Sequence, residues 1–307
     1  MDLKKGGVAL LIMVSLGVLS FVIYSLFLSW EFAILLIGSL VFHEYGHLWA
    51  AKRVGMQTKG IYLIPFVGGV AVSGGRPPSQ AAWVFVALAG PAFGFALALV
   101  TALAYVLTGW TVLAAAAWWM AMLNLFNLIP IYPLDGGQVM HCIACSVPRP
   151  VGIVICGISL LLAVGVVLIG PLLLGMLIVW MAWSGLADYM WGRPHREWQR
   201  RTLEVAEEDL EDGSLKDDDR LRLSLICAER NSEDPFPKIL SARELLPRVR
   251  AKIEELTEPR SLTGAGVMLS VESYLLLAGV LALLFVHTIT VPGALESFYQ
   301  IVGIPVQ

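Results

Sequence analysis

The sequence predicts an all-α polytopic membrane protein with about six or seven transmembrane helices, a re-entrant β-hairpin and a small helical cytosolic segment. Three observations lead to this class. Hydrophobic residues make up 57% of the 307 residues and charged residues only 15%, which lies outside the range of soluble globular domains. Several apolar runs reach the roughly 20 residues that a helix needs to cross the hydrocarbon core. The 21 lysine and arginine residues are also distributed unevenly along the chain.

The apolar runs are the candidate spans. They fall at about 8–28, 32–50, 82–107, 111–131, 151–169, 171–190 and 271–291. The first run lacks a small-residue cleavage site, which favours a retained span over a removed signal peptide. The weakest division lies at residues 170–171, where one long kinked helix is the alternative to two helices.

The basic residues predict the orientation. With a cytosolic N-terminus, every lysine and arginine falls in the inner segments 1–7, 51–81, 132–150 and 191–266, and the outer connections carry none. This asymmetry follows the positive-inside rule. We therefore expect a multi-pass integral membrane protein whose N-terminus and residues 192–266 are cytosolic. No organelle signal is apparent, which favours a prokaryotic plasma membrane.

Two segments depart from the pattern of apolar helices. Residues 60–75 are too short to span, and their β-branched residues alternate around a Gly-Gly pair, which favours a hairpin dipping into the bilayer. An interfacial loop on the headgroups is the alternative. Residues 192–266 form a polar block in which apolar residues at helical spacing predict two to four amphipathic helices. These apolar residues are Leu203, Ala206, Leu210, Leu221, Leu225, Ile253 and Leu256. The expected organisation is a transmembrane core over 1–191, a cytosolic helical segment over 192–266, and a last span with a short outer tail over 267–307.

An HExxH motif at residues 43–47 lies inside the second apolar run. His43 and His47 are four residues apart and share one helical face, so both imidazoles can bind one metal ion. Glu44 can then face a water molecule on that metal. Packed core histidines are the structural alternative. However, an ionised carboxylate near a bilayer centre costs about 3 kcal/mol, which favours a functional role.

A third ligand is needed, because catalytic zinc sites have three protein ligands and one open position. Asp135 is the candidate, as the only acidic residue between Glu44 and Asp188. Pro130 and Pro133 break the preceding helix, so we expect the Asp135 carboxylate to leave regular structure. An ordinary turn acid at the cytosolic interface is the alternative. The sequence thus predicts one Zn²⁺ per chain.

HExxH followed by NLIPIYPLDGG at 127–137 resembles the motif pair of the site-2 protease family of intramembrane zinc metalloproteases. Two weaker matches accompany the pair. FVGG at 66–69 is similar to the family's membrane hairpin, and AGP at 89–91 is similar to a segment that often continues to an Asn, where this chain has Gly94. The resemblance covers roughly residues 32–140.

The resemblance implies roles for five residues. His43, His47 and Asp135 would bind zinc, and Glu44 would be the catalytic acid/base. Asn127 would help to hold the substrate or the oxyanion. Of these roles, only that of Asn127 depends mainly on the resemblance.

The expected reaction is hydrolysis of a peptide bond in or near a transmembrane helix of a membrane-protein substrate, near the cytosolic side, as in regulated intramembrane proteolysis. His47 and His43 precede Lys52 by five and nine residues, so the metal would lie roughly 7–14 Å below the cytosolic boundary. The expected partners are this substrate and the lipid bilayer. A net charge of −3 excludes a basic nucleic-acid binder. The alternatives are a membrane metal transporter and an inactive, protease-like binder of transmembrane helices.

His141, Cys142 and Cys145 form an HCxxC pattern shortly after Asp135. A second metal site is one interpretation. Packed helix residues are the favoured one, because no second ligand pair accompanies the pattern in the sequence.

Overall fold

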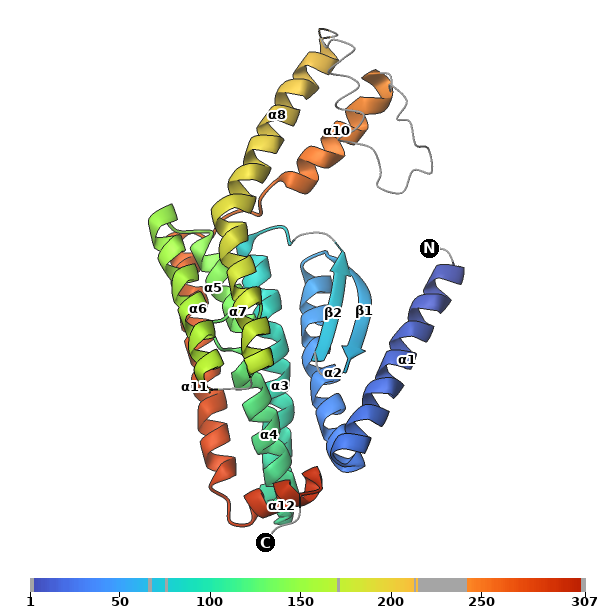
Figure 1. Ribbon diagram of the computed structural model, residues 1–307, viewed down its shortest axis with the longest axis vertical. Coiled ribbons are helices and arrows are strands. Elements are labelled where there is room, and N and C mark those ends of the chain that lie inside the picture. The colour runs from blue at the N-terminus through green and yellow to red at the C-terminus, as the bar shows by residue number, and fades with distance from the viewer. Residues whose placement is uncertain are drawn as a thin grey trace. The chain divides into compact units, whose positions relative to one another are not determined.

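The computed structural model describes residues 3–65, 68–74, 77–169, 172–212, 214 and 242–304. The elements in chain order are α1 (Leu3–Phe27), α2 (Trp30–Arg53), β1 (Gln57–Ile64), β2 (Gly68–Gly74), α3 (Gln80–Thr108), α4 (Thr111–Asn127), α5 (Asp135–Ala144), α6 (Arg149–Ile169), α7 (Leu172–Ala187), the π-helix η1 (Asp188–Gly192), α8 (Arg193–Glu211), α10 (Ala242–Leu256), α11 (Gly264–Ile289) and α12 (Ala294–Val302) (Figure 1). They form two compact units. One comprises Met1–Gly185 and Arg260–Gln307, and the other Leu186–Pro259.

Each predicted apolar run contains a helix, so the helical class is confirmed. Among the described residues, three helices are long and apolar enough to cross a membrane, namely α2, α3 and α11. Shorter apolar helices occupy Leu11–Phe27, Thr111–Asn127 and Arg149–Gly165. The count of six or seven spans therefore stays a prediction.

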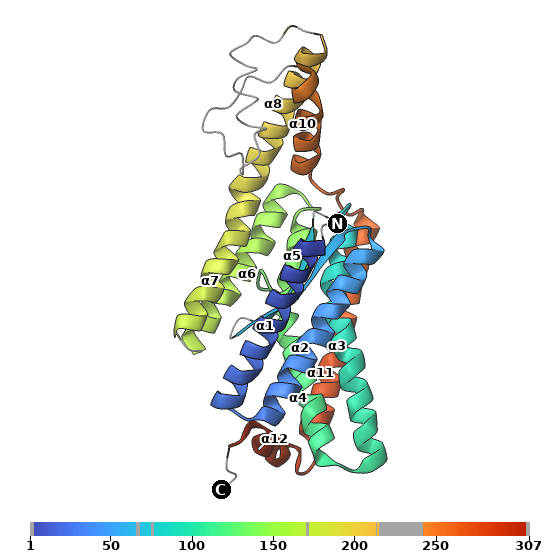
Figure 2. The ribbon, with the colours of Figure 1, turned by 90° about the vertical axis from the view of Figure 1, so that its right-hand side faces the viewer.

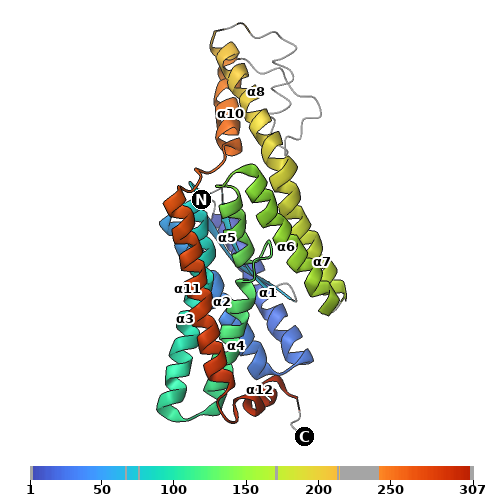
Figure 3. The same cartoon turned by 90° about the vertical axis from the view of Figure 1, so that its left-hand side faces the viewer.

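Four helices of the first unit, α2, α3, α4 and α11, form the framework around the candidate site. Helix α3 packs against α2 and α4, and α11 packs along α3 and α4 (Figures 2 and 3). Small side chains line the α3–α4 contact and let the two backbones approach closely. The contact includes Ala98, Ala102, Ala117 and Ala121, covered by Leu281 and Leu284 of α11.

Helix α2 lies in close backbone contact with α3 within the HExxH motif. A Cβ on Gly46 would lie 2.5 Å from the carbonyl oxygen of Ala89, closer than real Cβ atoms come to another atom. Glycine at position 46 therefore allows the α2 backbone to lie directly on α3. This contact brings the histidines of α2 beside the AGP segment of α3.

The segment expected to form a hairpin does so. Strands β1 and β2 pair antiparallel with Ile61 opposite Ala71 and Tyr62 opposite Val70. The hairpin lies between α1 and α2 (Figure 1), and the Ser20 hydroxyl of α1 donates a hydrogen bond to the Leu63 carbonyl at 3.2 Å. β1 begins at Gln57, three residues before the predicted start. Phe66 and Val67 of the resembling segment lie outside the described residues, and the depth of the hairpin in a bilayer stays a prediction.

The chain between α4 and α5 is irregular, as the two prolines there predict. Asp135, however, is the first residue of α5 rather than part of the irregular segment. The expectation that its carboxylate leaves regular structure is therefore wrong. The reason is that the two glycines after it permit tight packing of the first turn of α5. A Cβ on Gly136 would lie 2.1 Å from the Leu128 carbonyl oxygen, and one on Gly137 would lie 2.2 Å from the Ile131 carbonyl carbon.

Within its described residues, the second unit contains η1, α8 and α10, and the two amphipathic helices among them fall within the range of two to four predicted. An apolar cluster joins α8 to α10 through Leu203, Leu210, Leu245, Val249 and Leu256. Leu221 and Leu225, which were expected to mark a further helix, lie outside the described residues. The Arg196 guanidinium binds the Asp188 carboxylate at 2.5 Å and that of Glu258 at 3.0 Å, which raises the pKa of Arg196 above its usual value. These contacts join the start of this unit to its end.

The segment predicted to be a short outer tail contains a helix, α12. Phe298 of α12 packs its ring against Trp118, Trp119 and Phe32, with ring centroids 4.5, 5.6 and 6.1 Å away. The hydroxyls of Ser297 and Thr111 lie 2.7 Å apart. The tail is therefore packed against the ends of α2 and α4.

Candidate metal centre

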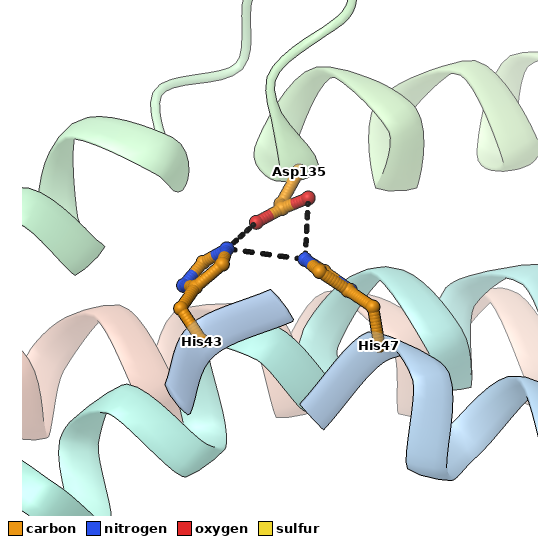
Figure 4. A group of neighbouring side chains, drawn as sticks. All are labelled: His43, His47 and Asp135. Carbon is orange, nitrogen blue, oxygen red and sulfur yellow. Dashed lines mark hydrogen bonds and ion pairs between the residues drawn. The ribbon is translucent and has the colours of Figure 1, made fainter. Parts of the chain in front are cut away.

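Three side chains expected to meet do so in the structure. The Nε2 atom of His43 lies 3.1 Å from Nε2 of His47 and 3.1 Å from Oδ2 of Asp135. The Nε2 atom of His47 lies 3.4 Å from Oδ1 of Asp135. Figure 4 shows both imidazoles of α2 and the carboxylate of α5 pointing toward one another. His43 and Asp135 are buried, with 2% and 6% of their surface exposed, so these two side chains meet in the interior of the protein.

The ring nitrogens facing away from this cluster determine which imidazole atoms are free to bind a metal. Nδ1 of His47 lies 2.7 Å from the carbonyl oxygen of Val86, which can only accept a hydrogen bond. Nδ1 of His43 lies 2.8 Å from Oδ1 of Asn124. Both Nδ1 atoms therefore carry the proton, and both Nε2 atoms present a lone pair. Ligand histidines in metal sites commonly have such outer partners.

This donor set fits a zinc ion. Two imidazole nitrogens and a carboxylate oxygen converge, and these are the atoms that bind zinc in proteins. Oδ2 of Asp135 is buried and accepts no hydrogen bond within the described part of the chain. Bonds of about 2.0–2.1 Å in tetrahedral geometry separate ligand atoms by roughly 3.3 Å, close to the separations seen here. The three donors lie within 4.8 Å of one another.

Helix α3 passes directly beside the two imidazoles. A Cβ on Gly90 would lie 2.2 Å from Nε2 of His47 and 2.8 Å from Nε2 of His43. Only glycine therefore leaves room for both rings at this point. Gly90 lies in the AGP segment singled out by the resemblance, but the sequence did not reveal what this glycine does.

Contacts with three helices hold the Asp135 segment in place. Gln138 of α5 accepts a hydrogen bond from the indole N–H of Trp83 in α3 at 3.1 Å. The backbone N–H of Tyr132 donates to the Ser159 hydroxyl of α6 at 3.1 Å. The Tyr274 hydroxyl of α11 donates to the Leu128 carbonyl at 2.5 Å, at the end of α4. Asp135 thus starts a short helix that is tied to the surrounding framework.

Glu44 lies beside the histidines and contacts the hairpin. Its side chain is buried, and its Oε2 atom accepts a hydrogen bond from the backbone N–H of Ala71 at 2.8 Å. A Cβ on Gly69 would lie 2.6 Å from Cγ of Glu44, so strand β2 packs directly on this side chain. The carboxylate is therefore held between the motif helix and β2.

The remaining sequence candidates lie outside this cluster. Asn127 is half-buried at the last residue of α4. Cys142 is buried in an apolar cluster with Val84, Val139 and Leu262. Within the described ranges, one group of three or more His, Cys, Asp or Glu side chains comes close enough to share an ion, and the HCxxC residues are not in it. The packed interpretation of HCxxC agrees with this arrangement.

Asn124 is the residue near the site that the sequence did not single out. It lies in α4, three residues before Asn127, and is 1% exposed. An asparagine within an apolar run is a signal that could have found it, because a buried amide in a membrane helix needs a partner.

The chain is similar to a known peptidase family and to several named proteins. Residues 31–112 match the sequence model of peptidase family M50. The chain is 39% identical over 117 residues to "Putative zinc metalloprotease Rip3" of Mycobacterium tuberculosis, covering 36% of this chain and 30% of that protein. It is 34% identical over 115 residues to "Zinc metalloprotease MJ0392" of Methanocaldococcus jannaschii, covering 36% of this chain and 33% of that protein. It is 36% identical over 122 residues to "Putative zinc metalloprotease sll0528" of Synechocystis, covering 38% of this chain and 31% of that protein.

The chain spans about a third of the length of these relatives. The matched segment contains the HExxH helix, which supplies two of the three converging donors, and the AGP segment packed against that helix. On this evidence, residues 31–112 of the chain are similar to peptidase family M50.

Proposed function

We propose that this protein is an intramembrane zinc metalloprotease. It would hydrolyse a peptide bond in or near a transmembrane helix of a membrane-protein substrate, near the cytosolic side, in regulated intramembrane proteolysis. The observation that carries this proposal is the convergence of His43, His47 and Asp135 next to the buried carboxylate of Glu44. The relation to family M50 supports it.

In this proposal the three side chains hold one zinc ion. When bound, zinc lowers the pKa of a coordinated water to about 7 and polarises the carbonyl to be attacked. Glu44 supplies the proton transfers. Its carboxylate accepts a proton from the attacking water and then delivers it to the nitrogen of the leaving amine. Asn127, at the end of α4, is proposed to donate its amide N–H to the substrate or to the developing oxyanion.

Strand β2 offers a place for the substrate backbone. A helical substrate hides its scissile bonds in hydrogen bonding and must unwind before attack. The N–H of Ala71 points to Glu44, so the edge of β2 that does not pair with β1 faces the carboxylate. An unwound segment that adds as a strand along this edge would lie beside Glu44.

The proposed orientation in the membrane follows from the distribution of basic residues. Lys52 and Arg53 end α2, about one and a half turns beyond His47 and about two and a half turns beyond His43, and mark the proposed cytosolic boundary. We place the N-terminus and residues 192–266 on the same side, in a prokaryotic plasma membrane. Cleavage at the depth of the histidines would release a fragment to the cytosol.

A Glu44→Gln variant tests the proposal. Purified protein would be incubated in liposomes with a panel of single-span helical peptides, with and without a zinc chelator. We expect zinc-dependent cleavage by the wild type. Glu44→Gln should keep its zinc and fold while losing roughly 10²–10⁴-fold in rate. Glu31→Gln, the same change in the first turn of α2, is the matched control.

Two results would overturn the proposal. The first is cleavage by Glu44→Gln at the wild-type rate. The second is zinc transport across the liposome membrane by both proteins without any cleavage, which would favour a transporter.

A further inference from the structure

Asn124 is a polar side chain buried inside an otherwise apolar helix. It is 1% exposed and lies one turn before the end of α4, after the alanine-rich part of this helix. A buried amide without hydrogen-bond partners is costly, so its contacts need to be accounted for. The amide makes two, one within α4 and one to His43 of α2.

The contact within α4 fixes which way the amide points. Its Nδ2 donates to the carbonyl oxygen of Met120 at 2.7 Å, and a carbonyl cannot donate. Oδ1 therefore faces Nδ1 of His43 at 2.8 Å and accepts its proton. As a result, Nε2 of His43 keeps its lone pair directed at Asp135 and His47.

Helix α3 provides the space for this amide. A Cβ on Gly94 would lie 2.0 Å from Oδ1 and 2.3 Å from Nδ2 of Asn124. Any side chain at position 94 would thus displace the amide from His43. Gly94 is the position at which the sequence departs from the Asn of the resembling family segment.

We infer that Asn124, seated over Gly94, is the positioning residue for His43. It sets the tautomer and the ring orientation with which this histidine meets the metal. The inference presupposes the proposed zinc site. His47 has the equivalent anchor in the backbone carbonyl of Val86, which no side-chain change removes, so Asn124 is the anchor that substitution can test.

The test measures binding of zinc alone, without a substrate. The dissociation constant of Zn²⁺ would be determined by chelator competition, and the visible spectrum of the Co²⁺-substituted protein would report the ligand geometry. Loss of an outer partner of a ligand histidine typically costs 10–100-fold in metal affinity, so Asn124→Ala should bind Zn²⁺ that much more weakly. Thr288→Val, which removes a buried hydroxyl from α11, should bind zinc as the wild type does.

A second substitution separates positioning from general packing. Gly94→Ser alone should weaken zinc binding, because its Cβ would displace Asn124. In the double variant Gly94→Ser/Asn124→Ala, the serine hydroxyl lies one bond beyond that Cβ and can take the vacated place of Oδ1. The double variant should therefore recover most of the lost affinity and the wild-type Co²⁺ spectrum, whereas Gly94→Ala/Asn124→Ala, which relieves the same clash without supplying an acceptor to His43, should not.

The measurements distinguish failure of the inference about Asn124 from failure of the proposed function. Wild-type zinc affinity in either single variant overturns the inference, as does a double variant that is weaker than both. If Asn124→Ala does not fold, Gly94→Ser and the double variant alone decide the matter. Failure of the wild type to bind zinc would overturn the proposed function itself. Zinc binding without proteolysis would leave the inference intact and contradict only the protease.

Discussion

The carboxylate of Glu44 accepts a hydrogen bond from the backbone N–H of Ala71 at 2.8 Å. This contact joins the HExxH helix to the hairpin at the residue proposed to move protons. Since the donor belongs to the backbone, its loss can be tested by proline at position 71 without removing any side chain from the site.

Ala71→Pro should lower the cleavage rate while zinc content stays at the wild-type level. A hydrogen bond to a charged group contributes about 1.5–3 kcal/mol, which corresponds to roughly a 10- to 150-fold loss of rate. Val70→Pro removes a backbone N–H that faces β1 instead and should also impair cleavage by loosening the hairpin. The measurements are initial rates and bound zinc per chain. Undiminished cleavage by both variants would argue against any role of β2.

The three converging side chains should each be needed for zinc. We expect one Zn²⁺ per chain in the wild type and close to none in His47→Ala or Asp135→Ala, because two remaining ligands bind too weakly to survive dialysis. Metal content would be measured by elemental analysis after dialysis. His287→Ala, at the exposed end of α11, is the control and should keep its zinc. A wild-type zinc content in Asp135→Ala would require a different third ligand.

Gly90→Ala should abolish zinc binding, although it adds only one methyl group. The new Cβ would lie 2.2 Å from Nε2 of His47, so one imidazole must leave its position. Gly279→Ala in α11 is the matched control, because a Cβ there meets nothing within 4 Å. It should be neutral or stabilising, since alanine favours the helix by about 1 kcal/mol over glycine. Zinc content and thermal unfolding temperature would be compared, and equal zinc binding by the two variants would contradict the geometry described.

Leu245→Ala should destabilise the second unit. Its side chain is fully buried between α10 and α8, and such truncations cost about 2–5 kcal/mol. Hydrogen exchange of α8 and α10 measures the loss of protection. Val205→Ala, at an exposed position on α8, should change little. Unchanged exchange in Leu245→Ala would mean that the two helices do not stabilise each other.

Local patterns in the sequence were sufficient for much of the fold. Helical runs depend on a continuous apolar composition, and the hairpin depends on alternation around a Gly-Gly pair, so both can be read from neighbouring residues. α12 was missed because nine residues with one apolar face resemble a tail until Phe298 meets Trp118 and Trp119. The helical start at Asp135 was missed because proline predicts where a helix ends more clearly than where the next one begins.

The site likewise combines features that depend on neighbouring residues with features that depend on contacts between distant residues. The four-residue spacing of His43 and His47 is a local property, so their shared face was predictable. Asp135 could be selected only because acidic residues are scarce in the apolar part of the chain. Asn124 and Gly94 lie 30 residues apart in the sequence. The role of neither could be predicted alone, because the glycine leaves the space that the Asn124 amide fills. Such pairwise complementarity requires knowledge of which helices touch.

The close contact of α2 with α3 at Gly46 has a mechanical consequence. With no side chain between the two backbones there, and with each imidazole fastened to a neighbouring helix, the motif helix is immobilised on one flank. If the proposed function holds, room for a polypeptide substrate would have to arise on the other side of this helix, where β2 packs on Glu44. In that case α2 and its metal ligands would stay in place, and the hairpin strand β2 would be the part that moves.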